Sequence, residues 1–198
     1  MTLQNTNFSI ISNNCWGGYV YQEQNLPYQS PFVGLFLYAK DYYKLVSHFR
    51  YYMTKELTFR EELEYFAPGD YYYPIGQLGD LEIHFLHYKT KEEAFEKWNR
   101  RKERLNYDNL YFKFDNRDGA DADLLKKIDQ LPYQNKIIFV NRPEPDLESS
   151  VYIPGQESSD AIFLMPNVSD YFDVISWLNK GGNALPEDDA SAEALSNP

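Results

Sequence analysis

The stretch that decides the fold lies at residues 110–140 and reads LYFKFDNRDGADADLLKKIDQLPYQNKIIFV. Its two ends, Leu110–Phe114 and Lys136–Val140, are short and mostly apolar, which is typical of buried strands. Between them Asp121–Leu131 predicts a helix, which Pro132 ends. Because a strand, a helix and a strand in this order join parallel strands, the stretch predicts a largely parallel or mixed sheet in a three-layer α/β/α fold.

The same alternation extends toward the N-terminus. Phe8–Ile11 predicts a first strand, followed by a cluster of turn-forming residues at 12–18. Leu81–Tyr88 predicts a further strand, and Thr90–Leu105 predicts a helix, since Thr90 and Glu93 have the spacing of a capping box. Three further elements are expected before Leu81: an apolar run at Phe32–Tyr38, a helix from an Asp41 cap to about Met53, and a loop with some strand at Phe66–Gly79. Toward the C-terminus we expect short antiparallel edge strands at Val151–Ile153 and Ala161–Met165 and a last helix at Ser169–Leu178.

Length and composition fit a single domain. The chain has 198 residues, of which 43% are hydrophobic and 17% aromatic, and this excludes a disordered or low-complexity protein. We expect one α/β domain at residues 1–180. Residues 181–198 are small, polar and acidic, without Lys or Arg, and predict a disordered tail.

The net charge and the cysteine content restrict which classes of partner and which cellular compartment are expected. The 19 Lys and Arg against 30 Asp and Glu give a formal net charge of −11, which argues against a general affinity for nucleic acid or anionic lipid. The single Cys excludes an intramolecular disulfide and a Cys-rich zinc site. The polar N-terminal segment and the short longest apolar run, Val33–Ala39, predict no signal peptide, no transmembrane helix and a cytoplasmic location.

Polar residues follow the expected strands. In open α/β sheets ligands bind beyond the carboxyl ends of the strands. The residues there are Asn13, Asn14, Cys15, His87, Tyr88, Asp115, Asn116, Arg117, Asn141 and Arg142. They suit a binding site, and they equally suit caps and turns, which require the same residue types.

Cys15 and His84 are the candidate reactive groups. Cys15 precedes Gly17 and Gly18, where a helix can begin, and a helix N-terminus activates a thiol by lowering its pKa; a buried, inert thiol is the alternative. On a strand Asp80, Glu82 and His84 share one face, as a carboxylate-oriented general base requires. A core histidine is the alternative there. His84 and His87 would face opposite sides, so we expect no metal site.

The expected helix at 90–105 carries a basic run. Arg residues at helical spacing can grip the phosphate or pyrophosphate of a nucleotide sugar, a lipid-linked sugar or coenzyme A. The run comprises Lys97, Arg100, Arg101, Lys102 and Arg104. Glu93 and Glu96 precede Lys97 and Arg100 by four residues, which is instead typical of an exposed helix face.

Four stretches carry a family resemblance: ISNNCWGG at 11–18, LPYQSPFVGL at 26–35, GDLEIHFLHY at 79–88 and KWNRR at 97–101. With them the chain, over about residues 8–180, resembles a bacterial family known as a domain of unknown function. Its members are often described as exopolysaccharide or capsule biosynthesis proteins and sometimes as acetyltransferases. The resemblance implies a three-layer α/β/α domain and a role in surface polysaccharide production.

Two hypotheses follow. In the first, the protein is a cytoplasmic sugar-modifying transferase of exopolysaccharide synthesis, for example an acyltransferase, that uses a coenzyme A thioester or a nucleotide sugar. Cys15 or His84 would react, Asp80 and Glu82 would orient His84, and the substrate would be held by Asn14, Arg101, Asp115 and Arg117. In the second, the protein is not catalytic and binds a sugar-phosphate intermediate or a partner of the polysaccharide machinery. The sequence leaves the donor, the acceptor and the oligomeric state open.

Overall fold

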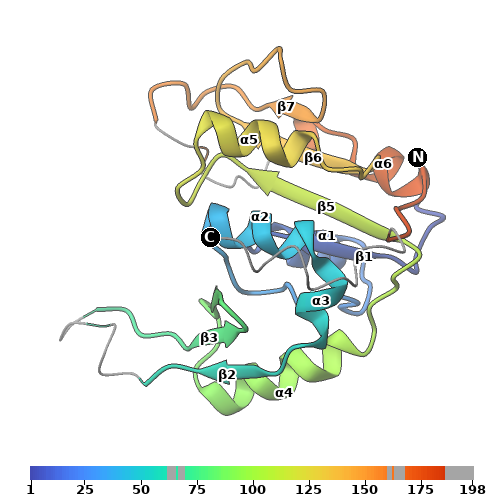
Figure 1. Ribbon diagram of the computed structural model, residues 1–198. Coiled ribbons are helices and arrows are strands. Elements are labelled where there is room, and N and C mark those ends of the chain that lie inside the picture. The colour runs from blue at the N-terminus through green and yellow to red at the C-terminus, as the bar shows by residue number, and fades with distance from the viewer. Residues whose placement is uncertain (62–65, 67–69, 160–161, 163–167, 186–198) are drawn as a thin grey trace.

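Parallel strands form the main sheet, in the order β1-β5-β6-β7 (Figure 1). They are β1 (Ser9–Ser12), β5 (Leu110–Asp115), β6 (Lys136–Val140) and β7 (Ser150–Tyr152). The computed structural model describes residues 1–61, 66, 70–159, 162 and 168–185. The strands expected in the 110–140 stretch are confirmed. β7 pairs with β6 in parallel rather than antiparallel, with Phe139 opposite Val151.

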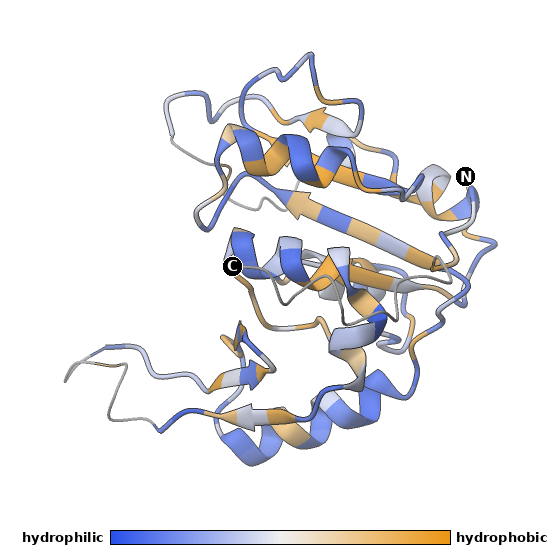
Figure 2. Ribbon diagram, viewed as in Figure 1, coloured by the Kyte–Doolittle hydropathy of each residue, from blue (hydrophilic) through white to orange (hydrophobic). Residues whose placement is uncertain are grey.

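Helices cover both faces of this sheet, as a three-layer fold requires. On β1, Ile10 packs with α1 (Trp16–Glu23) and α6 (Val174–Asn179), whereas the next residue, Ile11, packs with α2 (Ala39–Ser47) and α5 (Ala122–Asp129). The alternation of side chains along a strand produces this division. Figure 2 shows the resulting apolar strands, in contrast to the mainly hydrophilic helix α4 (Lys91–Lys102).

A second, antiparallel sheet contains β2 (Leu57–Phe59), β3 (Ile75–Leu78) and β4 (Leu81–His84). The prediction that 81–88 continues the parallel sheet is therefore wrong, and the strand ends at His84. The two-residue turn Gly79-Asp80 between β3 and β4 is the reason, because so short a link can join only antiparallel strands. Gly79 takes the positive φ of +67° that this turn needs.

Other elements differ locally from the prediction. The residues at 12–18 include the start of α1, not only a turn. The helix expected to run to Met53 is broken at His48 into α2 and α3 (Phe49–Thr54), and Tyr38 rather than Asp41 caps it. The apolar run at 32–38 forms a single bridge, from Phe36 to His84. The C-terminal helix starts at Val174, after a short 3-10 turn at Val168–Asp170, and Ala161–Met165 lies outside the described residues except for Ile162.

Residues that follow the boundary expected at residue 180 contact the folded body. Asn183 forms a backbone bridge with Leu110, and its side chain accepts a hydrogen bond from the backbone of Gln134 at 2.6 Å. Leu185 is buried. Residues 181–185 therefore pack on the folded body, because they supply a partner for the start of β5. None of the helices in the described ranges combines the length and the apolar character needed to cross a bilayer.

Candidate functional site

The carboxyl ends of β1 and β5 form a switch point in the main sheet. These two strands are neighbours, yet α1 follows β1 onto one face and α5 follows β5 onto the other. At such a point the two loops diverge and leave a crevice, where ligands of α/β proteins bind. The sequence places Asn13 and Asn14 after β1, and Asp115 at the end of β5.

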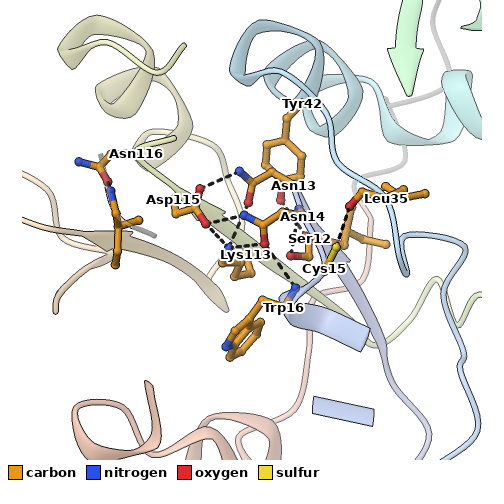
Figure 3. Close-up of polar contacts among 12 residues, drawn as sticks. Ser12, Asn13, Asn14, Cys15, Trp16, Leu35, Tyr42, Lys113, Asp115 and Asn116 are labelled. Atoms are coloured by element: carbon orange, nitrogen blue, oxygen red, sulfur yellow. Dashed lines mark hydrogen bonds and ion pairs between the residues drawn. The ribbon is translucent and has the colours of Figure 1, made fainter. Parts of the chain in front are cut away.

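A closed polar network fills this crevice (Figure 3). The Lys113 ammonium donates to Asp115 Oδ2 at 2.5 Å, to Asn14 Oδ1 at 2.9 Å and to Asn13 Oδ1 at 3.2 Å. Asn13 and Asn14 in turn donate to the two oxygens of the Asp115 carboxylate, at 3.0 and 2.5 Å. All three lysine protons and both carboxylate oxygens thus have partners. The charged atoms of the network are therefore paired with one another inside the fold.

Burial and charge act against each other in this network. Lys113 and Asp115 are both fully buried. Burial raises the pKa of Asp115, but the Lys113 charge and the two amides outweigh it and hold the pKa below its usual value. Burial lowers the pKa of Lys113, opposed by the Asp115 charge. Lys113 and Asp115 form a buried ion pair that joins the ends of β1 and β5 through the two asparagines. Asn14 and Asp115, expected to hold the substrate, are sealed inside the network.

The network positions Cys15 through helix α1. Asn14 Oδ1 also accepts from the backbone N–H of Trp16 at 3.3 Å, which satisfies one of the free donors at the start of the helix. The Cys15 thiol then points to the Leu35 carbonyl, with 3.7 Å between sulfur and oxygen. Burial raises the pKa of this thiol to about 11, and the nearby charges of Lys113 and Arg117 offset only part of the effect. Cys15 is a protonated thiol, and the activation expected at a helix N-terminus is absent.

His84 lies apart from Cys15, in an aromatic enclosure of the small sheet. Its ring stacks on Phe36, with 4.5 Å between centroids, and contacts the edge of Tyr38. Glu82 approaches it, with Oε2 at 3.7 Å from Nε2. Burial, together with the charge of Arg60, lowers the pKa of His84 to about 4. The ring is neutral and shielded from solvent. These properties are those of a core histidine, the alternative to a general base.

Asp80 does not orient His84. It sits in the exposed turn before β4, where its carboxylate accepts from Lys44 Nζ and from Tyr52 Oη, each at 2.8 Å. The alternation rule fails for Asp80 because the residue lies in the turn, before the strand begins. Arg117 occupies the loop after β5, next to Asp118, and neither residue lines the pocket described next.

A pocket of about 280 Å³ opens between α1, α4 and two connecting segments. It is lined by Cys15, Gly18, Tyr19, Gln22, Tyr28, Val33, Gly34, His87, Tyr88, Lys97 and Arg101. We call it the Arg101 pocket. Of the candidate site residues, it brings together Cys15 and Arg101. The expectation that Cys15, His84 and Asp115 share one crevice is wrong, because β4 belongs to the other sheet and Asp115 is enclosed.

Arg101 is the dominant charge of this pocket. Its side chain is buried, with 7% of the residue exposed. Nη1 donates to Tyr88 Oη at 2.6 Å, and the guanidinium lies over the Tyr28 ring, 4.6 Å from the centroid. Tyr88 Oη donates onward to the Val33 carbonyl at 2.6 Å, which fixes the position of the acceptor that Arg101 uses. Arg101 has no carboxylate partner in the described part of the chain.

Sequence reasoning missed several residues of the pocket. Tyr28 and Gly34 lie in a segment without regular structure, whereas Cys15, His87 and Tyr88 were among the strand-end candidates. Gly34 has a φ of +72°, and a Cβ there would lie 3.2 Å from the Tyr88 ring. Pro27 and Pro31 around Tyr28 indicate only a fixed turn. On α4 the signal was the spacing of Lys97 and Arg101, which are four residues apart.

Comparison with known proteins places the chain in a family. A family model described as "Domain of unknown function (DUF1919)" matches residues 1–179. The chain belongs to the DUF1919 family. It is also similar to an uncharacterised protein of Haemophilus influenzae (strain ATCC 51907 / DSM 11121 / KW20 / Rd), with 36% identity over 185 residues that cover 89% of this chain and 86% of the relative. The expected resemblance to a family of unknown function is confirmed. The match covers the whole main sheet, both candidate regions and α4.

Proposed function

We propose that this DUF1919 protein binds a phosphorylated sugar in the Arg101 pocket and acts in the cytoplasm, in the production of bacterial surface polysaccharide. The observation that carries the ligand chemistry is the buried guanidinium of Arg101, which has no carboxylate partner among the described residues. A buried charge without a counter-ion costs several kcal/mol, roughly, and a bound anion removes much of that cost. Arg also suits phosphate geometrically, because its fork of N–H donors can bind two oxygens.

The remaining walls suit a hydroxylated ring. Tyr19, Tyr28 and Tyr88 offer aromatic faces and hydroxyl groups. Gln22 adds an amide whose nitrogen donates to Tyr28 Oη at 2.7 Å. An aromatic surface with interspersed hydrogen-bonding groups is typical of sites that hold small polar molecules.

A ligand site at this pocket is supported by where the four resembling stretches lie in the fold. All four contribute to the pocket: Cys15 and Gly18 from the first, Tyr28, Val33 and Gly34 from the second, His87 and Tyr88 from the third, and Lys97 and Arg101 from the fourth. These stretches are distant in sequence, and the tertiary structure brings them to one cavity. A shared ligand site explains such convergence, and the family resemblance suggests the pathway.

We favour binding over acyl transfer. A nucleophilic thiol needs a lowered pKa or an adjacent base, and the pKa of Cys15 is raised to about 11. His84, the nominated base, lies in the aromatic enclosure and does not line the pocket. A base must reach the group whose proton it accepts. The proposal therefore rests on binding at Arg101 and not on catalysis by Cys15, His84, Glu82 and Asp80.

The test is binding of glucose 6-phosphate and glucose 1-phosphate, followed by thermal shift and calorimetry. Arg101→Gln should weaken binding about 10- to 150-fold, as expected for the loss of ~1.5–3 kcal/mol from charge-assisted hydrogen bonds. Arg100→Gln is the matched control, because Arg100 is exposed on the same helix and pairs with Glu96. Without ligand, Arg101→Gln should stay within about 4 °C of the wild-type Tm, since it also removes an uncompensated buried charge.

Two outcomes would contradict the proposal. A large drop in the Tm of unliganded Arg101→Gln, with no sugar phosphate binding to the wild type, would assign Arg101 to the fold. The pathway is tested separately, by deleting the gene and measuring surface polysaccharide. Wild type and Arg100→Gln should restore the polysaccharide and Arg101→Gln should not. Unchanged polysaccharide in the deletion strain would remove the pathway while leaving the ligand chemistry standing.

A further inference from the structure

The Arg101 pocket holds one uncompensated positive charge. Lys97 is the other permanently charged lining residue, and its Nζ forms an ion pair with Glu93 Oε1 at 2.6 Å. Glu93 is itself fixed, because its Oε2 accepts from the backbone N–H of Lys89 at 2.9 Å at the start of α4. The hydrogen bond from Lys97 lowers the pKa of Glu93, so the carboxylate is ionised. Glu93, on the same helix, thus compensates the charge of Lys97. Arg101 is the remaining cation that can bind the ligand.

A second phosphate group would find no equivalent cation. The neighbouring Arg104 lies outside the pocket lining and donates to the Tyr28 carbonyl at 3.2 Å. Arg100, also on α4, pairs with Glu96 at 3.1 Å. Cys15, which also lines the pocket, adds a protonated thiol and no charge. Among the described lining residues Arg101 is thus the cation without an ion-pair partner, and its fork of donors can bind one phosphate group.

Close contacts between the segments that form the walls of the pocket limit its size. A Cβ at Gly18 would lie 3.0 Å from Val33 Cγ1, so α1 and the 28–34 segment already touch. Gly34 is held in the same way against the Tyr88 ring. Sites for drug-sized ligands measure roughly 300–1,000 Å³, and this pocket of about 280 Å³ is comparable to the smallest of them. It has room for one ring and one phosphate.

We infer, resting on the proposed function, that the Arg101 pocket selects a phosphomonoester with a single hydroxylated ring over nucleoside diphosphates and coenzyme A. The phosphate pairs with Arg101, and the ring packs against the tyrosines. A nucleotide sugar or a coenzyme A thioester carries a second phosphate group, for which the described lining supplies no further unpaired cation, and is larger than one ring with one phosphate. The protein then acts on the sugar before it is activated as a nucleotide derivative, or after that derivative has been cleaved to a monophosphate.

The first experiment compares four groups of probes by calorimetry on the full chain: glucose 1-phosphate and glucose 6-phosphate, inorganic phosphate, UDP-glucose, and coenzyme A. At least one hexose phosphate should bind about tenfold or more tightly than each of the other three. Equal or tighter binding of UDP-glucose or coenzyme A, weakened by Arg101→Gln, would overturn the inference and leave the proposed function intact. Equal binding of inorganic phosphate would show that the ring contributes nothing and would also overturn it. Absence of Arg101-dependent binding for every probe would overturn both.

The second experiment changes the charge count. Glu93→Gln keeps an acceptor for the Lys89 N–H but releases Lys97, giving the pocket a second uncompensated cation. The affinity for inorganic pyrophosphate relative to inorganic phosphate should rise about fivefold or more. Glu96→Gln, which frees the exposed Arg100 instead, should leave this ratio unchanged. An unchanged ratio in Glu93→Gln would show that Lys97 is not silenced by Glu93, and would overturn the single-charge assignment.

Discussion

Removing one charge from the buried Lys113–Asp115 pair should strongly destabilise the protein. In Asp115→Asn the ammonium of Lys113 stays fully buried and keeps only neutral acceptors, at 2.9 and 3.2 Å on Asn14 and Asn13. Breaking a buried ion pair costs about 3–5 kcal/mol, because one charge is left without compensation. The two remaining amide oxygens favour the lower end, about 3 kcal/mol. For a domain of this size that corresponds to a Tm lower by about 6–12 °C.

The assay is urea unfolding followed by circular dichroism, which gives the free energy of unfolding for each variant. Asp108→Asn is the control, because Asp108 is exposed. Lys113→Met should also destabilise, and its deficit should shrink as the pH falls, since the unpaired Asp115 becomes neutral on protonation. The double variant Lys113→Met, Asp115→Asn should be less destabilised than the sum of the single variants. Asp115→Asn with wild-type stability, or strict additivity in the double variant, would refute the assignment of the pair to the fold.

Three further predictions concern other parts of the chain. A chain that ends at Lys180 should have a Tm several degrees lower than a chain that ends at Leu185, because burying Leu185 contributes roughly 1.5–3 kcal/mol. The chain that ends at Leu185 should keep the wild-type Tm. Equal Tm values for the two truncated chains would show that residues 181–185 do not stabilise the fold. His84 has a pKa of about 4 in the fold and 6.5 when unfolded, so the unfolded state binds more protons between these values and the free energy of unfolding falls as the pH drops through this window, by roughly 3 kcal/mol at most. His84→Phe should flatten that part of the curve, and an unchanged pH dependence would contradict the enclosure. Gly34→Ala should cost about 1–2 kcal/mol because of the φ of +72°, and should also weaken sugar phosphate binding by pushing on the Tyr88 ring; full stability by urea unfolding would show that the segment relaxes freely.

Local sequence signals predicted the elements whose causes are local. The Thr90 hydroxyl accepts from the Glu93 N–H at 3.1 Å, as the capping spacing indicates, and Asp121 caps α5 in the same way. Lys136–Val140 forms β6 with the expected bounds. These features depend on residues within one turn or one strand, so they can be predicted from the local sequence without the rest of the chain.

The candidate site was only partly predictable for the same reason. Arg101 and Cys15 could be singled out from their spacing and their neighbours, but nothing local shows that the two residues share a cavity. The polarity of Asn14 and Asp115 is equally consistent with a ligand site and with a closed hydrogen-bond network. Only the positions of Lys113 and Asn13 decide between these outcomes, since a hydrogen bond made inside the fold is no longer available to a ligand.

The sequence by itself thus determined the α/β class, the strand–helix–strand unit at 110–140 and the excess of negative charge. The tertiary structure decided the rest. It placed β4 in a separate sheet, away from the crevice, because a two-residue turn after Leu78 cannot make a parallel crossover. It also decided which charges are free: Lys113 and Asp115 neutralise each other in the interior, whereas Arg101 is buried beside a pocket without a carboxylate among the described residues. Whether a charged side chain serves the fold or a ligand depends on its spatial neighbours, and those are set by contacts between segments far apart in the chain.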